Sequence, residues 1–163
     1  MPFTPNRHCS HCGAAFVPGD VWPKTCDGCS NMTWNNPTPV VVLLQRVDDG
    51  VLAVMRRLPP GAGMIGLVGG YVDHKEDLYA AARRERKEET GIDITDDPIR
   101  ILDARTAANN ILVIFCTSER VLREADIPPF VPNAEVSELL ILREPVEMAF
   151  SSHTDMLKRF LGR

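Results

Sequence analysis

Residues 70–92 read GYVDHKEDLYAAARRERKEETGI and carry the strongest helix signal in the chain. The segment from Asp77 to Thr90 is rich in alanine and charged residues, and Gly91 follows it at the position where glycine commonly ends a helix. Side chains three or four residues apart lie on one face of a helix. One such face holds Leu78, Ala81, Ala82, Glu85 and Glu89. We therefore expect a helix whose core-facing stripe continues into two carboxylates.

Glu88 stands three residues after Glu85, so the expected helix gathers three glutamates near its end. Like charges four residues apart destabilise a helix, and partial burial costs more unless a cation lies between them. A hard divalent ion such as Mg2+ prefers carboxylate oxygens and bridges to substrate phosphates. The alternative is a solvated helix face on which neighbouring cations neutralise the glutamates. Those cations are Arg83, Arg84, Arg86 and Lys87.

The same stretch resembles the Nudix box, G-x5-E-x7-R-E-U-x-E-E-x-G-U, in which U is an aliphatic residue. The residues that match are Gly70, Glu76, Arg84, Glu85, Glu88, Glu89, Gly91 and Ile92. Arg86 departs from the pattern, because the family usually has an aliphatic residue there that packs the helix against a sheet. We expect the charged end of Arg86 to reach solvent. The resemblance implies an α/β (α+β) fold, an α/β/α sandwich with a mixed sheet.

The resemblance also implies a reaction and a metal site. The implied ligands of Mg2+ or Mn2+ are Glu85, Glu88, Glu89 and the carbonyl of Gly69. Glu76 would hydrogen-bond within the box, and Arg84 would orient a catalytic glutamate through an ion pair. The implied reaction is hydrolysis of a nucleoside diphosphate linked to another moiety, such as ADP-ribose, NADH or an FAD-like compound. The alternatives are a housecleaning pyrophosphatase for nucleoside triphosphates and a sensor that binds nucleotide without cleaving it.

Residues outside the box supply further candidates. Glu135 and Glu138 are candidates for the general base or a further metal ligand at the substrate-binding site, with Glu119 as a weaker candidate. The alternative for each is an ordinary surface glutamate, which is the usual fate of this residue type. Arg56 and Arg57 end a predicted strand and could bind substrate phosphates, or form a solvated strand end. The aromatic residues that could stack on a base, or more simply pack in the core, are Trp34, Tyr71 and Phe150.

Four of the five cysteines form two pairs near the N-terminus, Cys9-x2-Cys12 and Cys26-x2-Cys29. Two such pairs supply the four thiolates of a tetrahedral, structural Zn2+ site. The alternatives are two disulfides or four free thiols, and the absence of an export signal argues against disulfides. The module resembles the zinc ribbon of the NADH pyrophosphatase branch, although the SQPW-type motif that this branch carries after the box is absent. Cys116 is expected to be a small buried residue.

The organisation expected from these motifs is a zinc ribbon over residues 1–34 and a Nudix hydrolase domain over residues 35–163. The WNNPTP stretch at residues 34–39 reads as the linker. A second helix is expected over Ser152–Leu161, with Ser152 and Asp155 as a variant capping box. The expected strands are Val40–Gln45, Val51–Met55, Ile65–Val72, Ile99–Asp103, Ile111–Cys116 and Glu138–Leu142, the first two joined as a hairpin through residues 48–50.

The 163 residues carry a net charge of −4 at pH 7. A chain without a broad positive field is not expected to bind nucleic acid, and a small nucleotide is the expected partner. No apolar run approaches the roughly 20 residues of a membrane helix, so no membrane association is expected. No apolar signal-peptide core is present near the N-terminus, so a cytoplasmic location is expected. Many Nudix relatives dimerise, which makes a homodimer one of the expected states.

Overall fold

The computed structural model describes residues 7–19 and 21–162. The chain divides into two compact units, Met1–Pro37 and Thr38–Arg163. The boundary lies inside the WNNPTP stretch, where asparagines and prolines interrupt regular structure.

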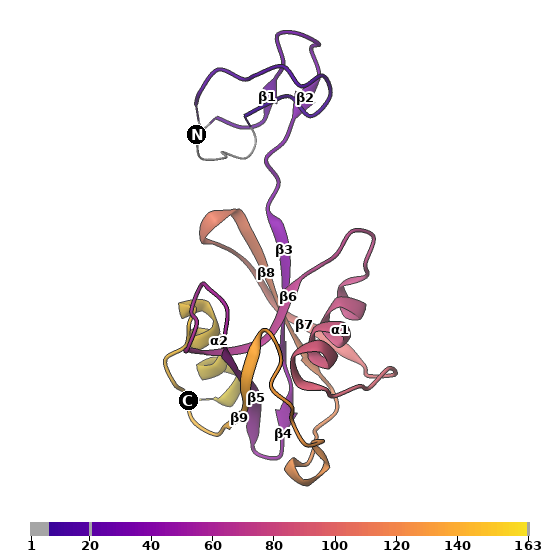
Figure 1. Cartoon of the computed structure of the whole chain (residues 1–163), viewed down its shortest axis with the longest axis vertical. Helices are drawn as coiled ribbons and strands as arrows, with labels where there is room; N and C mark the ends of the chain where they lie inside the picture. The colour runs from indigo at the N-terminus through magenta and orange to yellow at the C-terminus, as the bar shows by residue number, and fades with distance from the viewer. Residues whose placement is uncertain (1–6, 20, 163) are drawn as a thin grey trace. The chain divides into compact units, whose positions relative to one another are not determined.

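The N-terminal unit is a small ribbon built on two tight turns (Figure 1). β1 (Lys24–Thr25) pairs antiparallel with β2 (Met32–Thr33). Each Cys-x2-Cys segment forms a turn that is closed by a backbone hydrogen bond to the carbonyl of its first cysteine. These bonds run from Gly13 to Cys9 at 3.0 Å and from Ser30 to Cys26 at 2.8 Å.

The larger unit is built on a mixed sheet. Its strands are β3 (Thr38–Leu44), β4 (Arg46–Val47), β5 (Gly50–Arg56), β6 (Ile65–Tyr71), β7 (Ile99–Ala107), β8 (Ile111–Ser118) and β9 (Val136–Leu142). The strand order is β4-β5-β6-β3-β8-β7, and β9 pairs with β5. β3 runs parallel to β8, whereas the other paired strands are antiparallel. The expected mixed sheet is confirmed.

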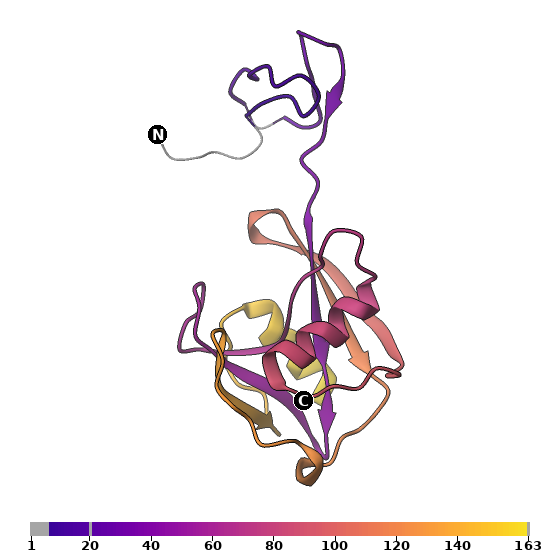
Figure 2. The ribbon, with the colours of Figure 1, turned by 45° about the vertical axis from the view of Figure 1, so that its right-hand side comes forward.

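The helices α1 (Leu78–Thr90) and α2 (Ser151–Leu161) cover opposite faces of this sheet (Figures 1 and 2). Alternation along β3 explains the layering, because successive side chains of a strand point to opposite faces. Val41 and Leu43 share a core cluster with two alanines of α1. Val42 and Leu44 share another with Met156 and Leu157 of α2. The expected α/β/α sandwich is therefore confirmed.

The ends of α1 follow the sequence signals. Asp77 is the N-cap, and its Oδ1 accepts hydrogen bonds from the amides of Tyr79 at 2.9 Å and Ala80 at 3.2 Å. Gly91 ends the helix in the left-handed region, with φ at 76° and its amide donating to the Lys87 carbonyl. These two positions mark where the helix begins and ends.

The predicted capping box of α2 is wrong. The helix begins at Ser151, and its N-cap is Phe150, which makes no side-chain capping hydrogen bond. Thr154 Oγ1 instead accepts a 3.0 Å hydrogen bond from the Met148 amide, so a residue inside the first turn holds the incoming chain. The 3-10 turns η1 (Ala108–Asn110) and η2 (Glu124–Asp126) lie in connecting segments.

The predicted hairpin turn at residues 48–50 is confirmed, but the strand that it joins to β5 is not the one predicted. The turn at residues 48–50 joins the short β4 to β5, whereas β3 pairs with β6 and β8. β7 extends to Ala107, four residues beyond the predicted end at Asp103. Among the described residues, the structure contains no helix long and apolar enough to cross a membrane.

Candidate active site

Two glutamates of α1 lie buried against β6, and a third faces solvent. Glu85 is 8% exposed and Glu89 is 4% exposed, whereas the Glu88 side chain is 58% exposed. The Gly69 amide donates a 2.9 Å hydrogen bond to Glu89 Oε2. A Cβ atom at Gly70 would lie 2.4 Å from Glu85 Oε1. The two glycines therefore let the backbone of β6 approach both buried carboxylates.

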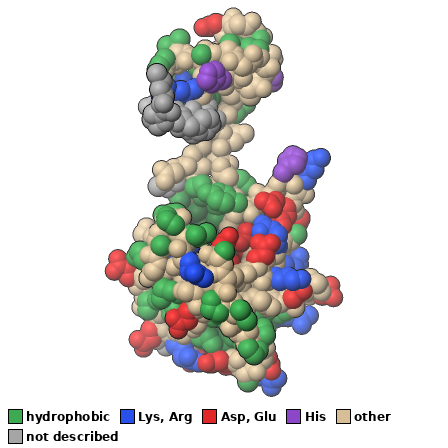
Figure 3. Space-filling view, in the orientation of Figure 1, with side chains coloured by type: hydrophobic (Ala, Val, Ile, Leu, Met, Phe, Trp, Pro, Cys, Tyr) green, Lys and Arg blue, Asp and Glu red, His purple; other side chains and the backbone are tan. Residues whose placement is uncertain are grey.

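Arg84 links these glutamates to the loop that precedes the helix. Its Nε and Nη2 donate to the two oxygens of Glu76 at 2.8 and 2.9 Å. Its Nη1 donates to Glu85 Oε1 at 2.8 Å and to Glu88 Oε2 at 2.9 Å. Acidic and basic side chains accordingly gather side by side over α1 (Figure 3). A two-pronged guanidinium–carboxylate pair fixes orientation, so Arg84 restrains the carboxylates on either side of it.

Burial controls the protonation of the two inner glutamates. Burial raises the pKa of Glu89 to about 8, although the hydrogen bond from Gly69 opposes this. Burial also raises the pKa of Glu85, against the effect of Arg84. The Arg84 hydrogen bonds lower the pKa of Glu76 instead. Burial therefore disfavours the ionised forms of Glu85 and Glu89. A bound divalent cation would stabilise these ionised forms.

The loop before β9 brings Glu135 toward the same glutamates. The charge of Glu135 contributes to the raised pKa values of both Glu85 and Glu89. Its carbonyl accepts a 2.8 Å hydrogen bond from the Arg57 amide at the end of β5. Of the three candidate general bases, Glu135 is therefore the one near the glutamates of α1.

The other two candidates lie elsewhere in the sheet. Glu138 pairs with Met55 in the β5–β9 ladder. The amide of Glu119, just after β8, donates to the Pro98 carbonyl at 2.9 Å. No interaction described for residues 7–19 and 21–162 joins either side chain to the glutamates of α1.

Asn133 is a site residue that the sequence did not indicate. Its Nδ2 donates to the carbonyls of Glu88 at 3.0 Å and Glu89 at 3.4 Å. Its Oδ1 accepts from the amides of Glu135 at 2.9 Å and Val136 at 2.8 Å. An asparagine ahead of a loop glutamate is a recognisable turn signal. The sequence gives no sign, however, of the helix end that the side chain reaches.

The two arginines at the end of β5 differ in their surroundings. The Arg56 guanidinium lies 5.2 Å from the centroid of the Phe150 ring, and its Nε donates to a loop carbonyl at 3.1 Å. Its charge lowers the pKa of Glu89. Arg57 Nη1 instead donates to the Asn133 carbonyl at 2.6 Å. Arg56 therefore acts electrostatically on Glu89, whereas Arg57 fastens a loop.

The three aromatic candidates also differ in their exposure to solvent. Trp34 is 60% exposed and Tyr71 is 58% exposed, so core packing was the wrong interpretation for both. Phe150 packs against His153, with 5.0 Å between the ring centroids. His153 is buried, and its Nδ1 accepts a 3.2 Å hydrogen bond from the Leu67 amide. Burial lowers the pKa of His153 to about 4, so this histidine is neutral at pH 7.

The four N-terminal cysteines converge within the ribbon. Their sulfur atoms all lie within 4.8 Å of one another. The Cys9–Cys29 sulfurs are 3.7 Å apart and the Cys12–Cys26 sulfurs 3.6 Å apart. A tetrahedral zinc with sulfur at about 2.3 Å places its ligands about 3.8 Å apart, whereas a disulfide needs about 2.0 Å. The cluster therefore fits Zn2+, and the four cysteines are not disulfide-bonded.

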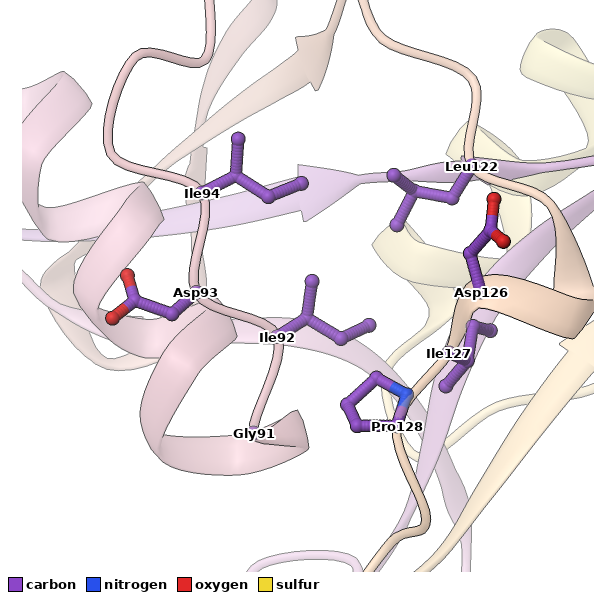
Figure 4. Close-up of a pocket in the computed structure, with 8 residues that line it drawn as sticks. All are labelled: Gly91, Ile92, Asp93, Ile94, Leu122, Asp126, Ile127 and Pro128. Carbon is purple, nitrogen blue, oxygen red and sulfur yellow. The ribbon is translucent and has the colours of Figure 1, made fainter.

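A pocket of about 430 Å³ lies beyond the end of α1 (Figure 4). Its walls are mostly apolar, and its charged residues are Asp93 and Asp126. None of the described residues that line it is cationic. A pyrophosphate needs cations or hydrogen-bond donors around it. The glutamates of α1 are therefore the better candidate for the reaction site.

The NUDIX domain family model matches residues 35–158. The chain belongs to the Nudix family. This match confirms the resemblance that residues 70–92 predict.

Curated proteins are similar to this Nudix chain over part of their length. The NAD-capped RNA hydrolase NudC of Photobacterium profundum is 26% identical over 151 residues, which cover 82% of this chain and 56% of that protein. The protein of the same name from Escherichia coli (strain K12 / DH10B) is 27% identical over 90 residues, covering 55% of this chain and 35% of that protein. The chain thus spans about half the length, or less, of these relatives.

Solved structures share the Nudix fold. A NUDIX hydrolase from Nitrosomonas europaea superposes with a TM-score of 0.71 at 23% identity, covering 96% of this chain and 90% of that one. A MutT protein from Methanosarcina mazei Go1 has a TM-score of 0.62 at 22% identity, covering 78% and 96% of the two chains. At these identities the likeness establishes the fold alone.

Arg86, the departure from the Nudix box, does not reach solvent. The expectation that its charged end would do so is wrong, because the residue is 0% exposed. Its guanidinium pairs with Asp97, and it donates to Gln45 Oε1 and to the Ile94 carbonyl, both at 2.9 Å. Asp97 Oδ1 accepts a 2.7 Å hydrogen bond from Ser118. A buried polar network therefore replaces the aliphatic contact between helix and sheet.

Proposed function

We propose that this chain is a metal-dependent pyrophosphohydrolase that cleaves the pyrophosphate of a nucleoside diphosphate joined to another moiety. The observation that carries the proposal is the set of glutamates on α1 that Arg84 restrains and β6 approaches through Gly69. A structural element alone has no need for two buried carboxylates with raised pKa values. Pure nucleotide binding has no need for them either.

The residues present suit Mg2+ or Mn2+. Glu85, Glu88 and Glu89, with the Gly69 carbonyl, would hold the ion, since hard divalent cations prefer oxygen ligands. When bound, such an ion would offset the charge that develops on the pyrophosphate and would make water more acidic. The chain's own groups would position the reactants. Water attacks one phosphorus, the bridging phosphorus–oxygen bond breaks, and two phosphate monoesters leave.

Each remaining residue has a separate role in this proposal. Arg84 holds Glu85 and Glu88 in the orientation that a cation requires. Arg56, whose charge reaches Glu89, would bind a substrate phosphate. Glu135, whose charge reaches Glu85 and Glu89, would add its carboxylate to the cation site and accept the proton of the attacking water. The cysteine cluster would hold a structural Zn2+, because four thiolates leave no open coordination position.

The substrate class that we propose is an NAD(H)-type dinucleotide. Support comes from the name of the NudC relatives and from the four-cysteine ribbon in front of the Nudix domain. ADP-ribose and FAD contain the same adenosine diphosphate unit and therefore belong in the same test. The nucleoside triphosphates represent the housecleaning alternative.

The test is a hydrolysis panel with Mg2+ and Mn2+, in which chromatography separates the products. Its substrates are NADH, NAD+, NAD-capped RNA, ADP-ribose, FAD and the nucleoside triphosphates. Wild type is compared with Glu89→Gln and with Glu119→Gln, a matched loss of one carboxylate away from the site. Cleavage of NADH to two monophosphates that only Glu89→Gln abolishes would support the proposal. Preference for a triphosphate would overturn the substrate class, and binding without cleavage would overturn the enzymatic function.

A further inference from the structure

The amide nitrogen and the amide oxygen of the Asn133 side chain both form hydrogen bonds. These bonds join two segments that are distant in sequence. The amide nitrogen donates to the carbonyls of Glu88 and Glu89 at 3.0 and 3.4 Å. The last carbonyls of a helix lack partners within the helix, so these acceptors need an outside donor. The amide oxygen accepts from Glu135 and Val136 at 2.9 and 2.8 Å. Asn133 thus fastens the start of β9 to the last turn of α1.

A second attachment acts on the same loop. Arg57 Nη1 donates to the Asn133 carbonyl at 2.6 Å, and the Arg57 amide donates to the Glu135 carbonyl at 2.8 Å. The backbone that carries Glu135 is therefore held from the helix on one side and from the end of β5 on the other. Glu135 itself is exposed, so packing does not hold its side chain in place.

Electrostatics alone would move Glu135 away from the site. Its carboxylate carries the same sign of charge as those of Glu85 and Glu89, the two buried glutamates of α1. Like charges at close range repel. Uncharged hydrogen bonds must therefore keep the Glu135 backbone near the helix before any cation binds. Asn133 supplies these bonds without adding charge.

We infer that Asn133 is a positioning residue that sets where Glu135 stands against the glutamates of α1. The inference rests on the proposed function, because it concerns the same site. It differs from a general contribution to stability in one respect. The effect of Asn133 should pass through Glu135, so removing Glu135 first should make Asn133 dispensable.

The test uses Asn133→Ala, Glu135→Gln and the double variant. Asn133→Ser is a second variant, since a serine hydroxyl can still accept from a nearby amide but is too short to reach the helix. Ser137→Ala is the matched control: Ser137 lies two residues beyond Glu135, and its hydroxyl donates to the Met55 carbonyl at 3.3 Å. Four quantities are measured: amide hydrogen exchange over residues 133–137, the Mn2+ affinity of the substrate-free protein, kcat and KM.

The expected results distinguish positioning from stability. Asn133→Ala should speed exchange at the Glu135 and Val136 amides, because both lose their acceptor. Mn2+ affinity and kcat should each fall about tenfold, a size typical of residues that orient metal-site groups. KM should change less than about twofold. Asn133→Ser should lose as much kcat as Asn133→Ala, and Ser137→Ala should match wild type.

The double variant tests whether Asn133 acts through Glu135. If Asn133 acts through Glu135, the double variant loses no more Mn2+ affinity or kcat than Glu135→Gln alone. Losses that multiply would overturn the inference, as would an Asn133→Ala variant with wild-type affinity. A wild-type protein that binds Mn2+ but cleaves nothing would overturn the proposed function, while the Mn2+ cycle would still test Asn133. A wild-type protein that binds no Mn2+ would overturn both.

Discussion

Arg86 on α1 pairs with Asp97, and neither side chain exposes any surface to solvent. The partners come from different parts of the unit, because Asp97 lies in the segment that leads into β7. Removing two charges from water is costly, and only the full set of contacts around the pair offsets that cost. Arg86 Nε is buried without a hydrogen-bond partner in the described part of the chain, so the compensation is incomplete.

Replacing Arg86 with leucine should destabilise the protein even though it restores the Nudix box pattern. Arg86→Leu leaves Asp97 buried and unpaired, so the free energy of unfolding should fall by about 3–5 kcal/mol. Arg86→Leu/Asp97→Asn removes the isolated charge and should recover at least half of that loss. Urea unfolding monitored by circular dichroism measures both. A double variant no more stable than Arg86→Leu would contradict this account.

The neighbouring exposed ion pair provides the control. Lys87 bonds to Asp93 at 2.7 Å, with side chains 62% and 49% exposed. Lys87→Ala should change the free energy of unfolding by less than about 1 kcal/mol, since solvent screens surface pairs. An equal loss of unfolding free energy in Arg86→Leu and Lys87→Ala would mean that helix propensity, and not burial of the ion pair, causes the destabilisation.

Gly70→Ala should impair the carboxylate site while the protein stays folded. The added Cβ would lie 2.4 Å from Glu85 Oε1, so Glu85 must leave its position. We expect Mn2+ affinity to fall about tenfold or more, as when groups that orient metal ligands are lost. Isothermal titration measures the affinity, and near-ultraviolet circular dichroism reports the fold.

Gly28→Ala is the matched control for that substitution. Its Cβ would lie 3.6 Å from the nearest atom, which is ordinary contact, and the residue belongs to the other unit. Mn2+ affinity should stay at the wild-type value. Unchanged affinity in Gly70→Ala as well would show that Glu85 is not needed for binding the cation.

Acid should destabilise the larger unit through His153. Burial lowers the pKa of His153 from 6.5 to about 4, so the folded protein resists a proton that the unfolded chain accepts. This contribution is present above pH 6.5 and is lost as the pH falls toward 4, by at most about 3 kcal/mol. Urea unfolding at pH 7.5, 6, 5 and 4 measures the dependence.

The variant His153→Asn shows how much of the pH dependence of stability comes from His153. The asparagine oxygen can still accept the bond that the Leu67 amide donates to Nδ1, but it does not titrate. Its stability should therefore fall less steeply between pH 6.5 and 4 than that of wild type, whatever its stability at pH 7.5. Parallel pH curves for the two proteins would contradict the assignment.

Removing zinc should unfold the ribbon and spare the larger unit. Metal binding supplies the folding energy of small four-cysteine modules. After chelation, proteases should cut within residues 1–37 and leave a fragment that starts near Thr38, because the two units are compact separately. Cys26→Ser should act like the chelator, whereas Cys116→Ala should retain about one zinc per chain by elemental analysis. Cleavage within the larger unit would contradict this prediction.

The sequence predicted α1 well because its signals are local. Asp77 and Gly91 lie at its ends, and the alanines that face the sheet recur at helical spacing. The four-cysteine cluster was equally predictable from the sequence, because each cysteine pair forms its own turn. Signals of this kind depend on neighbours a few residues apart, and the folded unit preserves them.

The features that the sequence did not predict depend on distant partners. Asp97 lies 11 residues after Arg86, and Gln45 lies 41 residues before it, so no local pattern marks the buried network. Asn133 reaches a helix end 44 and 45 residues earlier. The misassigned hairpin has the same origin, because the parallel partner of β3 is β8, more than 60 residues along the chain. Tertiary packing decides these pairings.

Four residues of α1 serve four different tasks on different sides of the helix. Ala81 faces the sheet, Glu85 faces β6, Arg86 enters the interior and Arg84 holds the preceding loop. Each added residue turns a helix by about 100°. A single insertion or deletion near the middle of α1 would therefore rotate a carboxylate toward the interior and an arginine toward the site at once. Over evolutionary time this helix should tolerate exchange of one side chain for another but not a change in its length.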